Sequence, residues 1–209
     1  MTAVYPVGGM LARALAVGTI FLAWVAADVL ADTPPRRSLA GRLLVATDAM
    51  TDTRFERTVI YIVRHDADGA FGLVVNLPQG EVPYERALRP LGLEVPPGSG
   101  NVRVHWGGPV SERRAFVLHT PEWTGEGTTV VDGGFALTED PRVLQAMARG
   151  SGPKRALFCL GYAGWAPGQL DGELTTRAWA VALADERLVF DDDAKQKWID
   201  AMSRRLLEL

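Results

Sequence analysis

The sequence predicts an α/β (α+β) fold, in which helices flank a large mixed β-sheet within a single domain. Two observations lead to this fold class. Short runs of β-branched and apolar residues recur between residues 42 and 190, and helical patterns lie among them without a strict βαβ repeat. The composition is 47% hydrophobic and 22% charged over 209 residues, which is enough to bury a core and excludes a largely disordered chain.

Seven segments are predicted strands. Residues 58–64 and 70–76 are β-branched runs on either side of a polar segment at 65–69, which predicts a hairpin with a five-residue turn. Residues 155–160 are strongly apolar, so we expect this strand to be the most buried. The other predicted strands are 42–46, 102–106, 115–119 and 128–131. Possible extensions of the sheet are 178–183 and 188–190.

Three segments are predicted helices. The pattern at 140–150 is the clearest, because Asp140 offers an N-cap, apolar residues repeat at helical spacing and Gly150 ends the run. Residues 84–91 predict a shorter helix. Residues 192–207 predict an amphipathic helix that closes the chain. Its apolar face is expected to contain Trp198, Ile199, Met202 and Leu206.

Residues 1–31 have the pattern of a signal peptide or membrane-directed segment. Residues 14–27 form an uncharged run of fourteen, which suits the core of an export signal and is shorter than the about 18 residues that a membrane span needs. Small residues favour cleavage after Ala31, and a start at Met10 would leave a compact basic segment before the apolar run. We therefore expect export to the periplasm through residues 10–31, with a cytoplasmic location as the alternative.

The rest of the chain is predicted to be a short linker and one folded domain. Residues 32–40 combine paired prolines with charges, which prevents a regular element. The folded domain is therefore expected to span residues 41–209. Any contact with a membrane is expected only through the N-terminal segment.

Charge and residue counts argue against several functions. The chain carries 22 basic and 25 acidic residues, so it has no basic field to hold a polyanion, and we expect no nucleic-acid partner. Cys159 is the single cysteine, and the three histidines are scattered, which argues against a closed zinc site. We assign no metal and no cofactor. The expected partner is a small molecule or a protein.

Glycines, aromatic residues and polar residues cluster at the ends of the predicted strands. Two glycine-rich segments are prominent, GGPV at 107–110 and GYAGW at 161–165, and neither matches GxGxxG or a phosphate-binding P-loop. A flexible backbone beside aromatic side chains suits a ligand pocket. The candidate ligand-binding residues are Phe55, Asn76, Gly107, Gly108, Pro109, Gly161, Tyr162, Gly164, Trp165, Gly168 and Gln169.

Taken in order, these segments resemble the AlgH/YqgE family of bacterial proteins over residues 41–207. The matching pieces are GRLLVA at 41–46, TVIYI at 58–62, GAFGLVVN at 69–76, GGPV, GYAGW and GQL-x-x-EL at 168–174. The resemblance implies a large mixed sheet in a sandwich-like arrangement. It implies no defined activity, although members carry the label of transcriptional regulators. Asp171, Arg177 and the N-terminal apolar segment depart from the family pattern.

The leading functional hypothesis is a non-catalytic binding or regulatory module. Its cleft would be formed by the GGPV and GYAGW loops, with Tyr162 and Trp165 covering an apolar ligand. This hypothesis expects Trp165 and His119 to lie together at an open cleft. The same aromatic side chains could instead complete the core, which is their commoner role.

Two other functions remain open at this point. The first is an enzyme for a small substrate, in which His119 would work with Asp52 or Glu173 as acid and base. The second is a cytosolic transcriptional regulator, which rests on the family label alone. The predicted helices at 140–150 and 192–207 have no basic face that could read a DNA groove.

Overall fold

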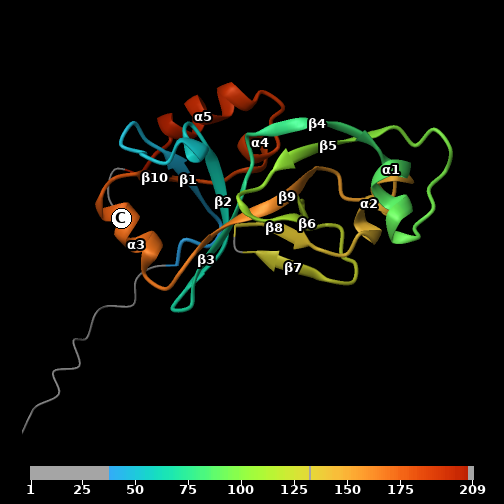
Figure 1. Ribbon diagram of the computed structural model, residues 1–209, viewed down its shortest axis with the longest axis horizontal. Coiled ribbons are helices and arrows are strands. Elements are labelled where there is room, and N and C mark those ends of the chain that lie inside the picture. The colour runs from blue at the N-terminus through green and yellow to red at the C-terminus, as the bar shows by residue number, and fades with distance from the viewer. Residues whose placement is uncertain (1–37, 132, 207–209) are drawn as a thin grey trace, which may run out of the picture. The chain divides into compact units, whose positions relative to one another are not determined.

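The computed structural model describes residues 38–131 and 133–206 (Figure 1). The predicted export segment and most of the predicted linker lie outside these residues. The strands are β1 (Arg42–Ala46), β2 (Val59–Asp66), β3 (Gly69–Val74), β4 (Pro78–Pro83), β5 (Asn101–Trp106), β6 (Val110–His119), β7 (Thr128–Val131), β8 (Phe135–Thr138), β9 (Ala156–Trp165) and β10 (Trp179–Leu183). The helices are α1 (Tyr84–Leu88), α2 (Arg142–Ala148), α3 (Gln169–Thr175), α4 (Glu186–Val189) and α5 (Ala194–Ser203), with short 3-10 turns η1 (Thr53–Phe55) and η2 (Arg89–Leu91).

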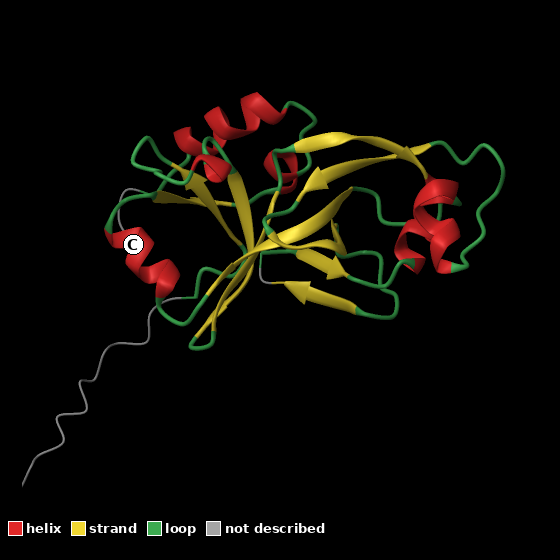
Figure 2. Cartoon of the chain, viewed as in Figure 1, coloured by secondary structure: helices red, strands yellow, loops and turns green. Residues whose placement is uncertain are grey.

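One curled sheet of ten strands organises the fold (Figure 2). Its main order is β10-β1-β2-β3-β9-β6-β8-β7, and β4 joins through β5. The long strand β9 pairs with β6 on one side. On its other side it pairs first with β5, in parallel, and then with β3, antiparallel. Both strand directions therefore occur in a sheet flanked by helices, which confirms the predicted fold class.

The junction of β3, β5 and β9 is made by glycine backbone. The N–H of Gly107 donates to the Leu160 carbonyl at 2.8 Å, and its own carbonyl accepts from the N–H of Val74 at 2.9 Å. A Cβ at Gly107 would lie only 2.3 Å from the Gly161 carbonyl oxygen. At Gly108, where φ is +147°, a Cβ would lie 2.1 Å from the Tyr162 carbonyl carbon. Side chains at these positions would separate the three strands.

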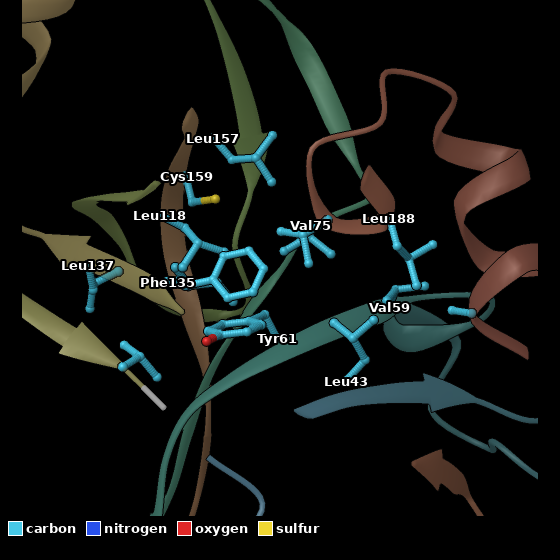
Figure 3. Packing of buried hydrophobic residues seen from close by; sticks show 14 of the residues in the cluster. Leu43, Val59, Tyr61, Val75, Leu118, Phe135, Leu137, Leu157, Cys159 and Leu188 are labelled. Atoms are coloured by element: carbon cyan, nitrogen blue, oxygen red, sulfur yellow. The ribbon is translucent and has the colours of Figure 1, made fainter. Parts of the chain in front are cut away.

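The main core lies where the sheet curls beneath α4 and α5. Figure 3 shows Tyr61 and Phe135 lying against each other beside Leu118 and Cys159. The two rings have centroids 4.8 Å apart. A second cluster lies beneath α3, and a third lies between the sheet and the paired helices α1 and α2 at the other end (Figure 1). The pair α4 and α5, the helix α3, and the pair α1 and α2 therefore cover three different parts of the sheet.

Several predicted elements agree with the structure, and others need correction. The strands at 42–46 and 128–131 have the predicted bounds, and α2 lies within the predicted helix at 140–150. GYAGW is the end of β9 rather than a loop. The predicted strand at 188–190 is wrong, because Asp185 caps the N–H of Leu188 and starts α4 there.

The length of one turn and the elements β4, β8 and α3 were also missed. The hairpin between β2 and β3 turns over Ala67 and Asp68 alone, since His65 and Asp66 still belong to the ladder. The edge strand β4 has the sequence PQGEVP. Its prolines and exposed polar residues do not form the apolar alternation that predicts a strand. Helix α3 was not predicted, because it begins directly after Gly168 with few apolar residues.

The C-terminal helix buries a different face from the predicted one. Trp198 and Met202 pack on the core, but Ile199 is 52% exposed, and Leu206 lies beyond the end of α5 and is exposed. The most buried side chains of α5 are Lys197 and Ala201. The reason is polar, because the Lys197 Nζ donates 2.7 Å hydrogen bonds to the carbonyl oxygens of both Val75 and Val189. This one amine attaches α5 to the end of α4 and to the chain that leaves β3.

Burial lowers the pKa of Lys197 to about 8, and nearby carboxylates offset only part of this effect. The ordinary pKa of a lysine side chain is 10.5. The unfolded chain therefore binds more protons between these two pH values, so the free energy of unfolding rises with pH in that window. We expect the native chain to gain about 2 kcal/mol relative to a Lys197→Met variant between about pH 7.5 and 9.5, from roughly 1.4 kcal/mol per pH unit. Urea denaturation at several pH values measures this difference.

The exposed Lys195 on the same helix provides the matched control. Lys195→Met should follow the native chain at every pH. The buried Cys159 thiol, whose pKa burial raises to about 12, is present in all three proteins, so its own titration cancels in the difference. A difference between the native chain and Lys197→Met that stays constant with pH would contradict the expectation.

Candidate functional site

A cleft of about 620 Å³ lies beside the end of β9. We call it the tryptophan cleft. Its walls come from the loop with η1, from the residues before β6, from the last residues of β9, from α3 and from the start of β10. The lining residues are Ala49, Met50, Thr51, Asp52, Arg54, Phe55, Pro109, Val110, Ala163, Gly164, Trp165, Gln169, Glu173, Thr176, Ala178 and Trp179.

A single carboxylate ties the aromatic wall of the cleft together. Trp165 is the last residue of β9 and Trp179 the first of β10, and α3 connects the two strands. The Glu173 Oε2 accepts hydrogen bonds from the Trp165 Nε1 at 2.9 Å and from the Trp179 Nε1 at 2.8 Å. Its Oε1 accepts from the Gln169 Nε2 at 2.9 Å. The indole rings are 8% and 4% exposed, so Glu173 satisfies donors that water barely reaches.

The opposite wall is a ring from the loop after β1. Phe55 lies 5.7 Å from Trp179 between ring centroids, edge to face, and 5.9 Å from Trp106. The Arg54 guanidinium lies over Phe55, 5.8 Å from the ring centroid. It also forms a 2.6 Å ion pair with Asp52, and the hydrogen bond from Arg54 is the main reason that the pKa of Asp52 is lowered. This part of the rim is therefore polar, and its two charged groups, Asp52 and Arg54, pair with each other.

The structure brings together part of the predicted site. The following predicted residues line the tryptophan cleft: Asp52, Phe55, Pro109, Gly164, Trp165, Gln169 and Glu173. Three predicted glycines lie instead at the junction of β3, β5 and β9: Gly107, Gly108 and Gly161. There, the lack of a side chain lets the strand backbones approach each other. Gly168 precedes α3 with a φ of +71°, which favours glycine at that position.

Two predicted residues have other surroundings. Asn76 is buried and joins the start of β2, because its Oδ1 accepts from the Val59 N–H at 2.8 Å and its Nδ2 donates to the Arg57 carbonyl at 2.9 Å. Tyr162 faces a neighbouring hollow of about 680 Å³, where its ring lies 4.8 Å from that of Phe71. That hollow shares Trp165 with the tryptophan cleft.

The structure does not bring His119 to the cleft, so the expectation that it would lie there together with Trp165 is wrong. Its side chain is buried, with the Nδ1 2.8 Å from the Thr120 carbonyl oxygen and the Nε2 2.9 Å from the Thr138 hydroxyl. Burial is the main cause of its lowered pKa. Both ring nitrogens are engaged, and the residue does not line the hollow that contains Asp52 and Glu173. The pairing of His119 with either carboxylate is therefore not formed.

Two aromatic residues of the site were missing from the sequence-based selection. Trp179 forms half of the indole pair, and Trp106 extends the aromatic wall behind Phe55. The spacing gave a usable signal for Trp179, which follows Glu173 by six residues across a short helix. No spacing in the sequence pointed to Trp106, because its contact with Phe55 forms only when the sheet has folded.

No further cofactor site emerges from the acidic, histidine and cysteine residues. Within residues 38–131 and 133–206, no three such side chains gather in a way that could hold a metal ion. None of the helices in this part of the chain is long and apolar enough to cross a membrane.

Comparison with known proteins assigns the family. A family model described as AlgH-like matches residues 43–208. The chain belongs to the AlgH-like family. A UPF0301 protein of Rhodospirillum rubrum is 47% identical over 166 residues, covering 79% of this chain and 86% of the relative. One of Cereibacter sphaeroides is 45% identical over 161 residues, covering 77% of this chain and 88% of the relative. The resemblance inferred from the motifs is confirmed.

Solved structures agree with this assignment. The solution structure of the AlgH protein from Pseudomonas aeruginosa matches with a TM-score of 0.68 and 36% identity, covering 81% of this chain and 89% of that one. A crystal structure of a protein from Corynebacterium diphtheriae matches with a TM-score of 0.61 and 23% identity, covering 80% and 87%. The second likeness concerns the fold alone.

Replacing Glu173 tests its role in holding the two indoles. Glu173→Leu leaves two buried N–H groups without an acceptor, so we expect the free energy of unfolding to fall by about 2–4 kcal/mol. Glu173→Gln keeps an acceptor oxygen and should lose only about 1 kcal/mol. Urea denaturation followed by circular dichroism measures both values. The exposed Glu56 gives the control Glu56→Leu. Equal losses for Glu173→Leu and Glu56→Leu would show that the indole contacts do not stabilise the fold.

Proposed function

We propose that this AlgH-like protein is a non-catalytic binding or regulatory module whose ligand enters the tryptophan cleft. The proposal rests on the hydrogen bonds of Glu173. Its carboxylate accepts from the side chains of Trp165, Trp179 and Gln169. A carboxylate held in this way shapes a pocket, whereas a general acid or base needs a free oxygen facing its substrate. The other carboxylate of the cleft, Asp52, is held by Arg54.

The cleft suits a particular class of ligand. Its volume of about 620 Å³ lies within the range of small-molecule sites. Phe55 provides flat apolar surface backed by the two largely buried indoles, and Asp52, Arg54 and Gln169 provide polar groups at the edge. A small molecule with a flat apolar body and a polar group, or a protein side chain of that kind, has the complementary chemistry.

The geometry offers less support for the acid–base hypothesis. His119 was its proposed base, and both nitrogens of that ring are bonded inside the protein. We likewise propose a small molecule or a protein as the partner rather than nucleic acid, because the net charge is −3 and the rim of the cleft contains only one basic side chain, Arg54.

A fragment screen tests the binding function. We expect small aromatic acids, amines and amides, screened by ligand-observed NMR, to include compounds that bind saturably and change the tryptophan fluorescence. Phe55→Ala removes one wall of the cleft and should weaken these compounds about tenfold or more, the loss of roughly 1.4 kcal/mol of contact.

The control variant is Val130→Ala, which alters an exposed apolar residue of β7 outside the cleft. It should leave the affinities unchanged. Compounds that bind the native chain and Phe55→Ala equally well would contradict the assignment of the cleft as the binding site. The absence of any saturable compound would contradict a small-molecule ligand of this class.

A further inference from the structure

A second cavity, of about 510 Å³, lies between the helices α1 and α2 and the sheet. It shares no lining residue with the tryptophan cleft. Its lining residues are Val82, Ala87, Pro90, Leu91, Val104, Arg113, Arg114, Ala115, Val117, Thr138, Glu139, Asp140, Pro141, Val143, Leu144, Phe158 and Leu160. We call it the apolar cavity, because aliphatic and aromatic side chains form most of its surface.

The walls of the apolar cavity are continuous and apolar. Val104, Val117 and Phe158 come from three adjacent strands and are buried in the third core cluster. Leu144 of α2 covers them from the helix side. At the mouth, Leu91 is 57% exposed. An apolar chain that bound there would remove the exposed surface of Leu91 from water.

Ion pairs engage three of the four charged side chains that line the apolar cavity. Arg114 pairs with Glu139 at 2.6 Å, and Asp140 pairs with Arg142 at 2.5 Å. Arg113 makes no ion pair or hydrogen bond with any residue that the structure describes. Among the charged residues that line the apolar cavity, the exposed Arg113 is therefore the one whose guanidinium remains available to a ligand.

An irregularity in β6 places this charge at the mouth. Consecutive residues of a regular strand face opposite sides of a sheet, yet Arg113 and Arg114 both line the apolar cavity. The register between β6 and β9 shifts between Val110 and Ala115, and Ser111 has a positive φ of 49°. A bulge of this kind redirects side chains and costs backbone strain.

We propose that the apolar cavity binds a single-chain amphiphile with an anionic head group. Its alkyl chain lies against Val104, Val117 and Phe158, and its head group receives charge-assisted hydrogen bonds from Arg113. A guanidinium is the side chain best suited to a planar carboxylate or a similar anion. A neutral apolar molecule would leave Arg113 unused, and a cationic amphiphile would be repelled by it.

Calorimetric titration of the full chain with dodecanoate, kept below its micellar concentration, tests the proposal. We expect saturable binding with one site per chain, and binding of dodecyltrimethylammonium at least about tenfold weaker. Arg113→Glu should weaken dodecanoate about tenfold or more and reverse the preference between the two amphiphiles. The control Arg187→Glu makes the same charge change at an exposed arginine outside the cavity and should have no more than about a twofold effect.

A second pair of variants tests the apolar part of the site. Leu91→Asp places a charge at the mouth and should weaken dodecanoate, whereas Leu183→Asp, at a leucine that is 51% exposed on β10, should not. The N-terminal segment is the same in every variant, so amphiphile bound there does not change between them. Absence of saturable binding, equal losses for Arg113→Glu and Arg187→Glu, or equal affinity for both amphiphiles would overturn the proposal.

Discussion

The close approach of three strands at Gly107, Gly108 and Gly161 is the constraint on which this structure depends. Because no Cβ separates the backbones there, β9 exchanges one neighbour for another along the same edge, from β5 to β3. The sheet thereby divides into two parts that β9 joins. The same crossing places the residues before β6 beside the end of β9, and this is the corner where the tryptophan cleft opens. The GGPV and GYAGW segments thus act mainly through their backbone.

Charged side chains that bond to neutral polar groups are the second organising feature. Glu173 receives three N–H groups, two of them from indoles at the ends of different strands, and so connects β9, α3 and β10. On the other side of the sheet, the Lys197 amine donates hydrogen bonds to two backbone carbonyl oxygens. It thereby connects α5 to α4 and to the chain after β3. In both cases one charged side chain satisfies several buried polar groups that apolar packing alone would leave without partners.

The sequence predicts local patterns in this fold well and long-range neighbours poorly. Most strands and the helix α2 follow from apolar periodicity and capping. The cleft does not, because Phe55 and Trp179 meet only after the sheet has formed. His119 was misplaced for a related reason. The last four residues of β6 are all buried, since both faces of the sheet are covered there, so the end of that strand is not a solvent-exposed position.

The two cavities differ in chemistry, yet they are connected by a common neighbour. The hollow beside Tyr162 shares Trp165 with the tryptophan cleft and shares Arg114 and Glu139 with the apolar cavity. The ion pair of Arg114 with Glu139 therefore borders the apolar cavity on one side and the hollow on the other. Arg114 also lies over the ring of Phe116, 5.2 Å from its centroid, and Phe116 packs edge to face against Tyr162. An anion at Arg113 would lie next to this chain of contacts, which runs from the mouth of the apolar cavity to the ring of Tyr162.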